Sequence, residues 1–177
     1  MLEIPVDLGP RRYAVSVGHG LSRTLGDLLG SLRGRRIVLV ASRRVFALHG
    51  APVARALGAL GRTTVVLVPD GERFKTAATL GRLHDAFLEA RLGRDGLVVA
   101  LGGGVVGDVA GFAAATWMRG VDWVGVPTTL LAMVDSSLAQ AESFRNTEWW
   151  PPVPAAVKSA GLDRAPAASP RRPPPPP

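Results

Sequence analysis

The chain has 177 residues, 47% of them hydrophobic and 20% charged, which predicts one globular domain, alone or followed by a tail. It has no cysteine, no signal-peptide pattern at its start and no run of about 18 apolar residues. Disulfides, thiolate metal sites and a membrane span are therefore excluded, and we expect a cytoplasmic protein. The net charge of +7 comes from scattered arginines without a nucleic-acid module, so we expect no nucleic-acid partner; an anionic small ligand fits the charge as well.

Short β-branched runs alternate with helix-like segments over residues 1–140. We predict strands at 12–17, 36–41, 63–68, 97–101 and 123–126, and helices at 21–29, 45–60, 76–92 and 105–117. Thr76 is the expected N-cap of the third helix, and Gly93 its expected stop. Because strands separated by helices form parallel sheets, the predicted fold class is α/β, a Rossmann-like parallel sheet with flanking helices.

Residues 141–177 have a different composition, since ten of the 15 prolines lie in residues 151–177. Prolines at this density remove N–H donors and block helix and sheet ladders. We therefore predict a domain at 1–140 and a disordered, Pro-rich tail at 141–177. The tail's PxxP at Pro170–Pro173 also admits an SH3-type ligand, although low-complexity sequence without a partner is the favoured interpretation.

The stretch ALGGGVVGDVAG at residues 100–111 places glycines between a predicted strand and a predicted helix. This arrangement suits a phosphate-binding loop, because the backbone can approach the anion and helix N–H groups point at it. The loop departs from the dinucleotide fingerprint, since it follows the fourth predicted strand and Asp122 begins the next strand instead of ending it. A tight turn for helix–sheet packing remains the alternative. Asp108 is equally consistent with a helix-start acid and with a carboxylate that binds a ligand hydroxyl.

The segment LVVALGGGVVGDVAGFAAATWMRGV, followed by VPTTLLAMVDSS and preceded by DGERFKT and GRD, resembles the 3-dehydroquinate synthase family. The resemblance implies a phosphate-eliminating lyase of the shikimate pathway, which serves aromatic amino-acid and chorismate biosynthesis. Its members convert 3-deoxy-D-arabino-heptulosonate 7-phosphate to 3-dehydroquinate and phosphate. It implies NAD as cofactor, a divalent metal (zinc or cobalt), and a homodimer as one candidate assembly.

The resemblance also assigns site residues, which follow the predicted strands as ligand-binding residues of open parallel sheets do. It implies NAD contacts at Ser42, Asp70, Glu72, Lys75, Gly103, Gly104, Val105, Asp108, Thr128 and Thr129, and substrate contacts at Arg119 and Asp135. It assigns no catalytic residue and no metal ligand. Each position also has a structural interpretation: a helix-end cation for Arg119, a helix cap for the two threonines and a surface lysine for Lys75.

The resemblance ends near Ser137, where the family continues with Gly-Gly-Lys-Thr and this chain reads Leu138–Ser143, with Ala141 in place of the lysine. The family's helical, metal-binding half is not recognisable, and the three histidines all precede the motif. Either residues from about 138 are read out of frame, or the protein is a shortened form with a new tail. We therefore expect an NAD-binding half that is inactive alone. A fragment of another sugar-phosphate cyclase and a non-catalytic NAD- or phosphate-binding module are the alternatives.

Overall fold

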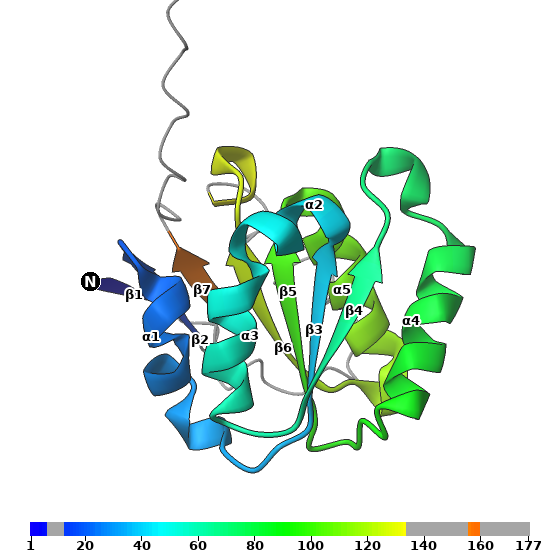
Figure 1. The fold of residues 1–177 in the computed structure, drawn as a ribbon, viewed down its shortest axis with the longest axis horizontal. Helices are drawn as coiled ribbons and strands as arrows, with labels where there is room; N and C mark the ends of the chain where they lie inside the picture. The colour runs from blue at the N-terminus through cyan, green and yellow to red at the C-terminus, as the bar shows by residue number, and fades with distance from the viewer. Residues whose placement is uncertain (7–12, 134–155, 160–177) are drawn as a thin grey trace, which may run out of the picture.

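The computed structural model describes residues 1–6, 13–133 and 156–159, which form two sheets and the helices around them (Figure 1). The larger sheet has four parallel strands in the order β4-β3-β5-β6. These strands are β3 (Ile37–Ser42), β4 (Thr63–Val68), β5 (Leu97–Gly102) and β6 (Asp122–Pro127). The smaller sheet has the order β1-β2-β7, with β1 (Leu2–Val6) antiparallel and β7 (Ala156–Ser159) parallel to β2 (Tyr13–Gly18).

Helices cover both faces of the larger sheet, as expected for parallel strands that are buried on both sides (Figure 1). They are α1 (Leu21–Leu28), α2 (Arg43–Val45), α3 (Ala51–Gly58), α4 (Ala77–Glu89) and α5 (Gly104–Thr116). A π-helical turn, η3 (Phe46–Gly50), joins α2 to α3, so residues 43–58 form one helical stretch where the sequence predicts a helix at 45–60.

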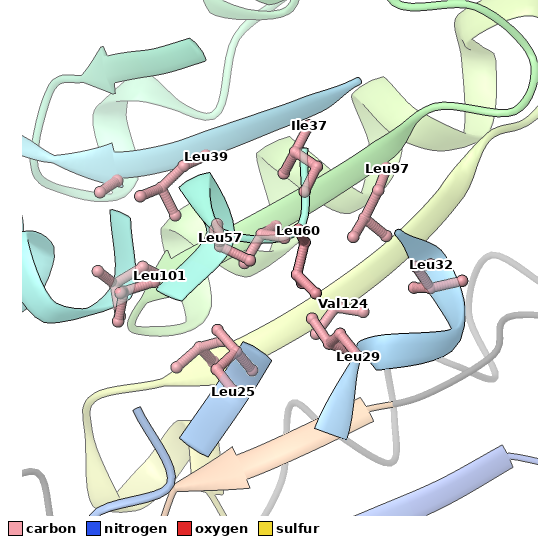
Figure 2. Close-up of a cluster of buried hydrophobic side chains, with 14 of the residues drawn as sticks. Leu25, Leu29, Leu32, Ile37, Leu39, Leu57, Leu60, Leu97, Leu101 and Val124 are labelled. Atoms are coloured by element: carbon pink, nitrogen blue, oxygen red, sulfur yellow. The ribbon is translucent and has the colours of Figure 1, made fainter. Parts of the chain in front are cut away.

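Alternate residues of the central strands face two separate cores. On one face, Leu39 and Leu101 pack with leucines of α1 and α3, as Figure 2 shows for Leu25 and Leu57. On the other face, Val40 and its neighbours pack with side chains of α4 and α5. The sheet therefore holds the carboxyl ends of β4, β3, β5 and β6 at one edge, framed by the four helices.

The predicted strands and helices of residues 13–116 are present, with two differences. Strand β2 does not join the four-stranded parallel sheet: it pairs with β1. The sequence did not predict β1, because Leu2–Pro5 have no buried, alternating face and Pro5, which rarely occurs in strands, lies within it. Helix α4 ends at Glu89, before the predicted stop at Gly93, and Arg91 takes the left-handed conformation (φ 53°) that was expected of the glycine. The predicted tail lies outside the described residues, apart from the four residues of β7.

Thr76 caps α4 as predicted, because its Oγ1 accepts a hydrogen bond from the backbone N–H of Thr79 at 3.2 Å. We expect Thr76→Ala to lower the free energy of unfolding by about 1 kcal/mol, since it leaves an N-terminal amide of the helix without a partner. Urea unfolding followed by circular dichroism measures the change. Thr76→Ser retains the cap oxygen and should unfold within about 0.5 kcal/mol of the wild type; equal losses in both variants would contradict the capping role.

Candidate functional site

The larger sheet has a topological switch point between β3 and β5. The chain passes from β3 to β4 on one side of the sheet, and then places β5 on the other side of β3. In open parallel sheets, ligands bind beyond the carboxyl ends of the strands at such a point. Ser42 ends β3 here, fully buried, and its Oγ accepts a hydrogen bond from the N–H of Val45 at 3.2 Å. Its hydroxyl therefore caps α2, so a contact with a ligand would have to share that oxygen.

The glycine loop joins β5 to α5 at this switch point. Helix α5 begins at Gly104, and its N-cap Gly103 provides no side-chain hydrogen bond. The first N–H groups of a helix have no partner within it, and the helix dipole makes this end electropositive. A Cβ at Gly102 would lie 2.7 Å from the side chain of Val106, and a Cβ at Gly103 would lie 3.2 Å from Thr129. Both glycines are therefore closely packed, and a larger side chain at either position would require its neighbour to shift.

The segment after β6 is hydrogen-bonded to the glycine loop. The N–H of Thr128 donates to the carbonyl oxygen of Gly102 at 2.9 Å, and the side chain of Thr129 faces Gly103. Thr129 Oγ1 also accepts a hydrogen bond from the N–H of Ala132 at 3.2 Å, which confirms the helix-capping interpretation for this threonine. The residues that follow β5 and β6 therefore contact each other directly at the carboxyl edge of the sheet.

Glu72, Lys75 and Asp108 come together from two separate elements. Glu72 begins the short 3-10 turn η4 (Glu72–Phe74) after β4, and Lys75 follows that turn. Lys75 Nζ lies 2.7 Å from Glu72 Oε1 and 2.5 Å from Asp108 Oδ2. Asp108 lies in the second turn of α5, so the structure does not support the helix-start interpretation, which was one of the two left open for it. Its carboxylate forms an ion pair with Lys75.

The environment of Lys75 stabilises its charged form. Hydrogen bonds that Lys75 donates to Asp108 and, to a smaller extent, to Glu72 raise the pKa of the ammonium group above its ordinary value, although partial burial opposes them. The amino group therefore stays protonated across the neutral range, and it can hold the two carboxylates in place.

A hollow of about 380 Å³ opens beside this cluster, between the N-terminal halves of α4 and α5. Lys75 and Asp108 lie at its polar part, and Leu80, Val109 and Phe112 form apolar walls. A second hollow of about 490 Å³ lies at the carboxyl end of β4, where Asp70 is flanked by Arg43 and Arg82. Polar groups thus face hollows on both sides of η4.

The two predicted substrate contacts do not join this group. Arg119 belongs to the 3-10 turn η5 (Trp117–Arg119), which precedes β6 and so lies at the amino edge of the sheet. The six residues of β6 separate it from the glycine loop by about 20 Å. Arg119 also has a positive φ of 70°, an uncommon conformation for a residue with a side chain. Asp135 lies outside the described residues.

The described residues fit a nucleotide cofactor better than they fit a metal ion. The N-terminus of α5 fits a pyrophosphate, because a helix start offers unpaired N–H groups to an anion, and a larger residue at Gly103 would crowd Thr129 beside it. Residues 1–6, 13–133 and 156–159 contain no group of three or more His, Cys, Asp or Glu that could hold a metal ion. His84, for example, lies 3.0 Å from the hydroxyl of Thr116, beside the rings of Phe87 and Trp117.

None of the helices in the described part of the chain is long and apolar enough to cross a bilayer.

Comparison with known proteins places these features in a family. Residues 65–147 match the family model described as 3-dehydroquinate synthase N-terminal, so the similarity runs past Ser137. The 3-dehydroquinate synthase of Pelotomaculum thermopropionicum is 52% identical over 140 residues, which are 78% of this chain and 38% of that protein. The 3-dehydroquinate synthase of Geobacter metallireducens is 48% identical over 140 residues, and the match covers 39% of it. The chain thus spans well under half the length of these relatives.

Solved structures share the fold. A 2-deoxy-scyllo-inosose synthase, solved with carbaglucose-6-phosphate, NAD+ and Co2+, superposes with a TM-score of 0.74 at 23% identity. The superposition covers 89% of this chain and 44% of that one. A 2-epi-5-epi-valiolone synthase from Streptomyces hygroscopicus, with NAD+ and Zn2+ bound, gives a TM-score of 0.65 at 24% identity, covering 87% of this chain and 44% of that one. At these identities the likeness establishes the fold alone.

The Lys75 cluster should make stability depend on pH at the alkaline end. The raised pKa means that its contribution is complete below the unfolded-state pKa of about 10.4 and is lost as the pH rises through the higher folded-state value. Lys75→Met should therefore lower the free energy of unfolding by about 0.5–1 kcal/mol at pH 8, with the difference vanishing above the folded-state pKa. Urea unfolding between pH 8 and about pH 11.5 measures this. The Lys75→Arg variant stays charged throughout, so its free energy of unfolding should remain above that of Lys75→Met at every pH. A gap between the wild type and Lys75→Met that grows as the pH rises would refute the assignment.

Proposed function

Since the chain belongs to the 3-dehydroquinate synthase family, we propose that residues 1–140 form the NAD-binding half of a 3-dehydroquinate synthase of the shikimate pathway. The corresponding reaction converts 3-deoxy-D-arabino-heptulosonate 7-phosphate to 3-dehydroquinate and phosphate in the cytoplasm. Support comes from relatives about 50% identical over 140 residues. The single structural observation behind the proposal is the glycine-lined start of α5 at the switch point, with the Glu72–Lys75–Asp108 cluster beside it.

Each part of the site then has a role in binding the cofactor. The backbone of Gly103, Gly104 and Val105 would hold the pyrophosphate, because N–H groups and the helix dipole favour an anion there. Asp70 and Glu72 accept hydrogen bonds from the hydroxyl groups of the adenosine side. Lys75 holds Asp108 toward the nicotinamide side through its ion pair. Thr128 and Thr129 are further proposed cofactor contacts, and they lie next to Gly102 and Gly103.

When bound, NAD supplies a reversible hydride transfer at one ring carbon of the substrate, which acidifies the neighbouring C–H bond. The described residues contribute binding and orientation: Asp108 and Lys75 form a charged pair at the edge of the apolar hollow. Arg119 and Asp135 remain proposed substrate contacts. Arg119 lies at the amino edge of the sheet, at the other end of β6 from the glycine loop.

The metal step receives no residues from the described part of the chain. Ligands for the family's divalent ion, zinc or cobalt, would therefore have to come from outside the described residues. An NAD- or phosphate-binding module without catalytic turnover is the second candidate function. A half of another sugar-phosphate cyclase is the remaining alternative.

Calorimetric titration with NAD tests the binding proposal. Asp108→Ala and Glu72→Ala should each weaken binding at least about tenfold, because each removes a charge-assisted hydrogen bond or its support. Gly103→Val should abolish binding, since its side chain would crowd Thr129 beside the start of α5. Asp85→Ala on α4 serves as the matched acidic control and should bind as the wild type does. If the wild type does not bind NAD, the proposal is wrong, and the glycine loop is a tight turn that serves helix–sheet packing.

The expected lack of turnover has its own test. The purified chain, supplied with NAD, zinc and the heptulosonate phosphate, should release no phosphate above the background of the Asp108→Ala variant, because the described residues hold no metal site. A phosphate-release assay coupled to detection of 3-dehydroquinate makes the measurement. Product formation that depends on both NAD and metal would show that the chain is a complete catalyst.

A further inference from the structure

A groove follows the free edge of β4 on the side away from β3. One hollow of about 710 Å³ is lined by the consecutive residues Thr64–Leu67 together with the C-terminal end of α4. The hollow of about 490 Å³ near Asp70 is lined by residues 66–70 and by Thr79 and Leu83 of α4. Because both hollows share Val66 and Leu67, they form one groove that runs along the strand beneath α4, which lies beyond β4 in Figure 1.

The groove exposes backbone hydrogen-bonding groups of β4. The N–H of Ile37 donates to the carbonyl oxygen of Arg62, so Arg62 and every second residue after it point their peptide groups toward β3. The N–H and C=O groups of Thr63, Val65 and Leu67 consequently point toward the groove. Within the described residues, β3 is the sole strand paired with β4. Four consecutive residues line one hollow because the strand's edge, and not one of its faces, forms the wall.

The two faces of this edge differ in chemistry. Val65 and Leu67 lie beside Leu39 and Ala41 on the α3 side of the sheet, yet they are 38% and 43% exposed. On the α4 side, Arg36 and Arg62, which directly precede β3 and β4, line the groove, and Arg82 and Arg91 line it from α4 or its end. Arg36 is fixed there, since its Nη1 donates to the carbonyl oxygen of Ala90 at 3.4 Å.

We propose that this edge binds an extended acidic peptide as an added strand, with acidic residues alternating with apolar ones. Neighbouring strands point side chains at the same register toward the same face, so apolar residues of the added strand would lie beside Val65 and Leu67. Its acidic residues would then face the arginines, and its backbone would pair with the edge groups of β4. A second copy of the chain fits less well, because the groove carries five arginines (residues 36, 43, 62, 82 and 91) against two acids, Asp70 and Glu89.

Fluorescence anisotropy with the full chain and a labelled peptide of alternating Glu and Val tests the proposal. We expect binding that weakens about tenfold when Lys replaces Glu, and also when the same residues are arranged as a block of Val followed by a block of Glu. Arg62→Glu and Arg91→Glu should each weaken it about tenfold, whereas Arg55→Glu on the exposed surface of α3 should not.

Val65→Pro isolates the backbone contribution, because it removes an outward N–H that β3 does not use. This substitution should weaken binding of the alternating peptide about tenfold and leave the affinity for NAD unchanged. The two results together separate this proposal from the proposed function. Three results would overturn it: equal binding of the block peptide, binding of single-stranded DNA in competition with the peptide and without sensitivity to Val65→Pro, or a concentration-dependent dimer in sedimentation that Val65→Pro abolishes. The last would assign the edge to a second copy.

Discussion

Parallel pairing of β3 with both β4 and β5 is the constraint on which the rest of the structure depends. Since parallel strands require a crossover, each strand is followed by a helix, and all four carboxyl ends emerge at one edge. The change of direction at β3 opens a switch point there. The glycine loop, η4 and the segment after β6 meet at this edge although more than fifty residues separate Glu72 from Thr129 in the chain.

The same constraint leaves β4 with an unpaired side. Both faces of β3 and β5 are buried under helices, whereas the residues of β4 that face α3 remain partly exposed. An open edge in a parallel sheet presents backbone groups that another strand can use. The molecule thus has two chemically different edges: a carboxyl edge suited to a small anionic ligand, and a β4 edge lined by arginines. The two adjoin at Asp70, which lines the hollow at the carboxyl end of β4.

Much of the site could be predicted from the sequence because it depends on local chemistry. The glycines of the loop and the cap at Thr76 act within a few residues, so their patterns survive in a single sequence. The position of Asp108 in the second turn of α5, and its pairing with Lys75, could not be derived in this way, since the partner lies on a different element. The end of α4 was misplaced because Arg91 adopts a conformation that propensity assigns to glycine.

The sequence by itself determined the α/β class, the four parallel strands with their helices, the glycine loop and the family to which the chain belongs. These follow from periodicity and from residues close together along the chain. Tertiary structure alone decided that β2 pairs with β1 outside the main sheet, that Lys75 joins Glu72 to Asp108, and that Arg119 lies at the opposite edge from the cofactor loop. The physical reason is that strand order and the direction of each crossover are set by the packing of whole layers, which no local pattern encodes.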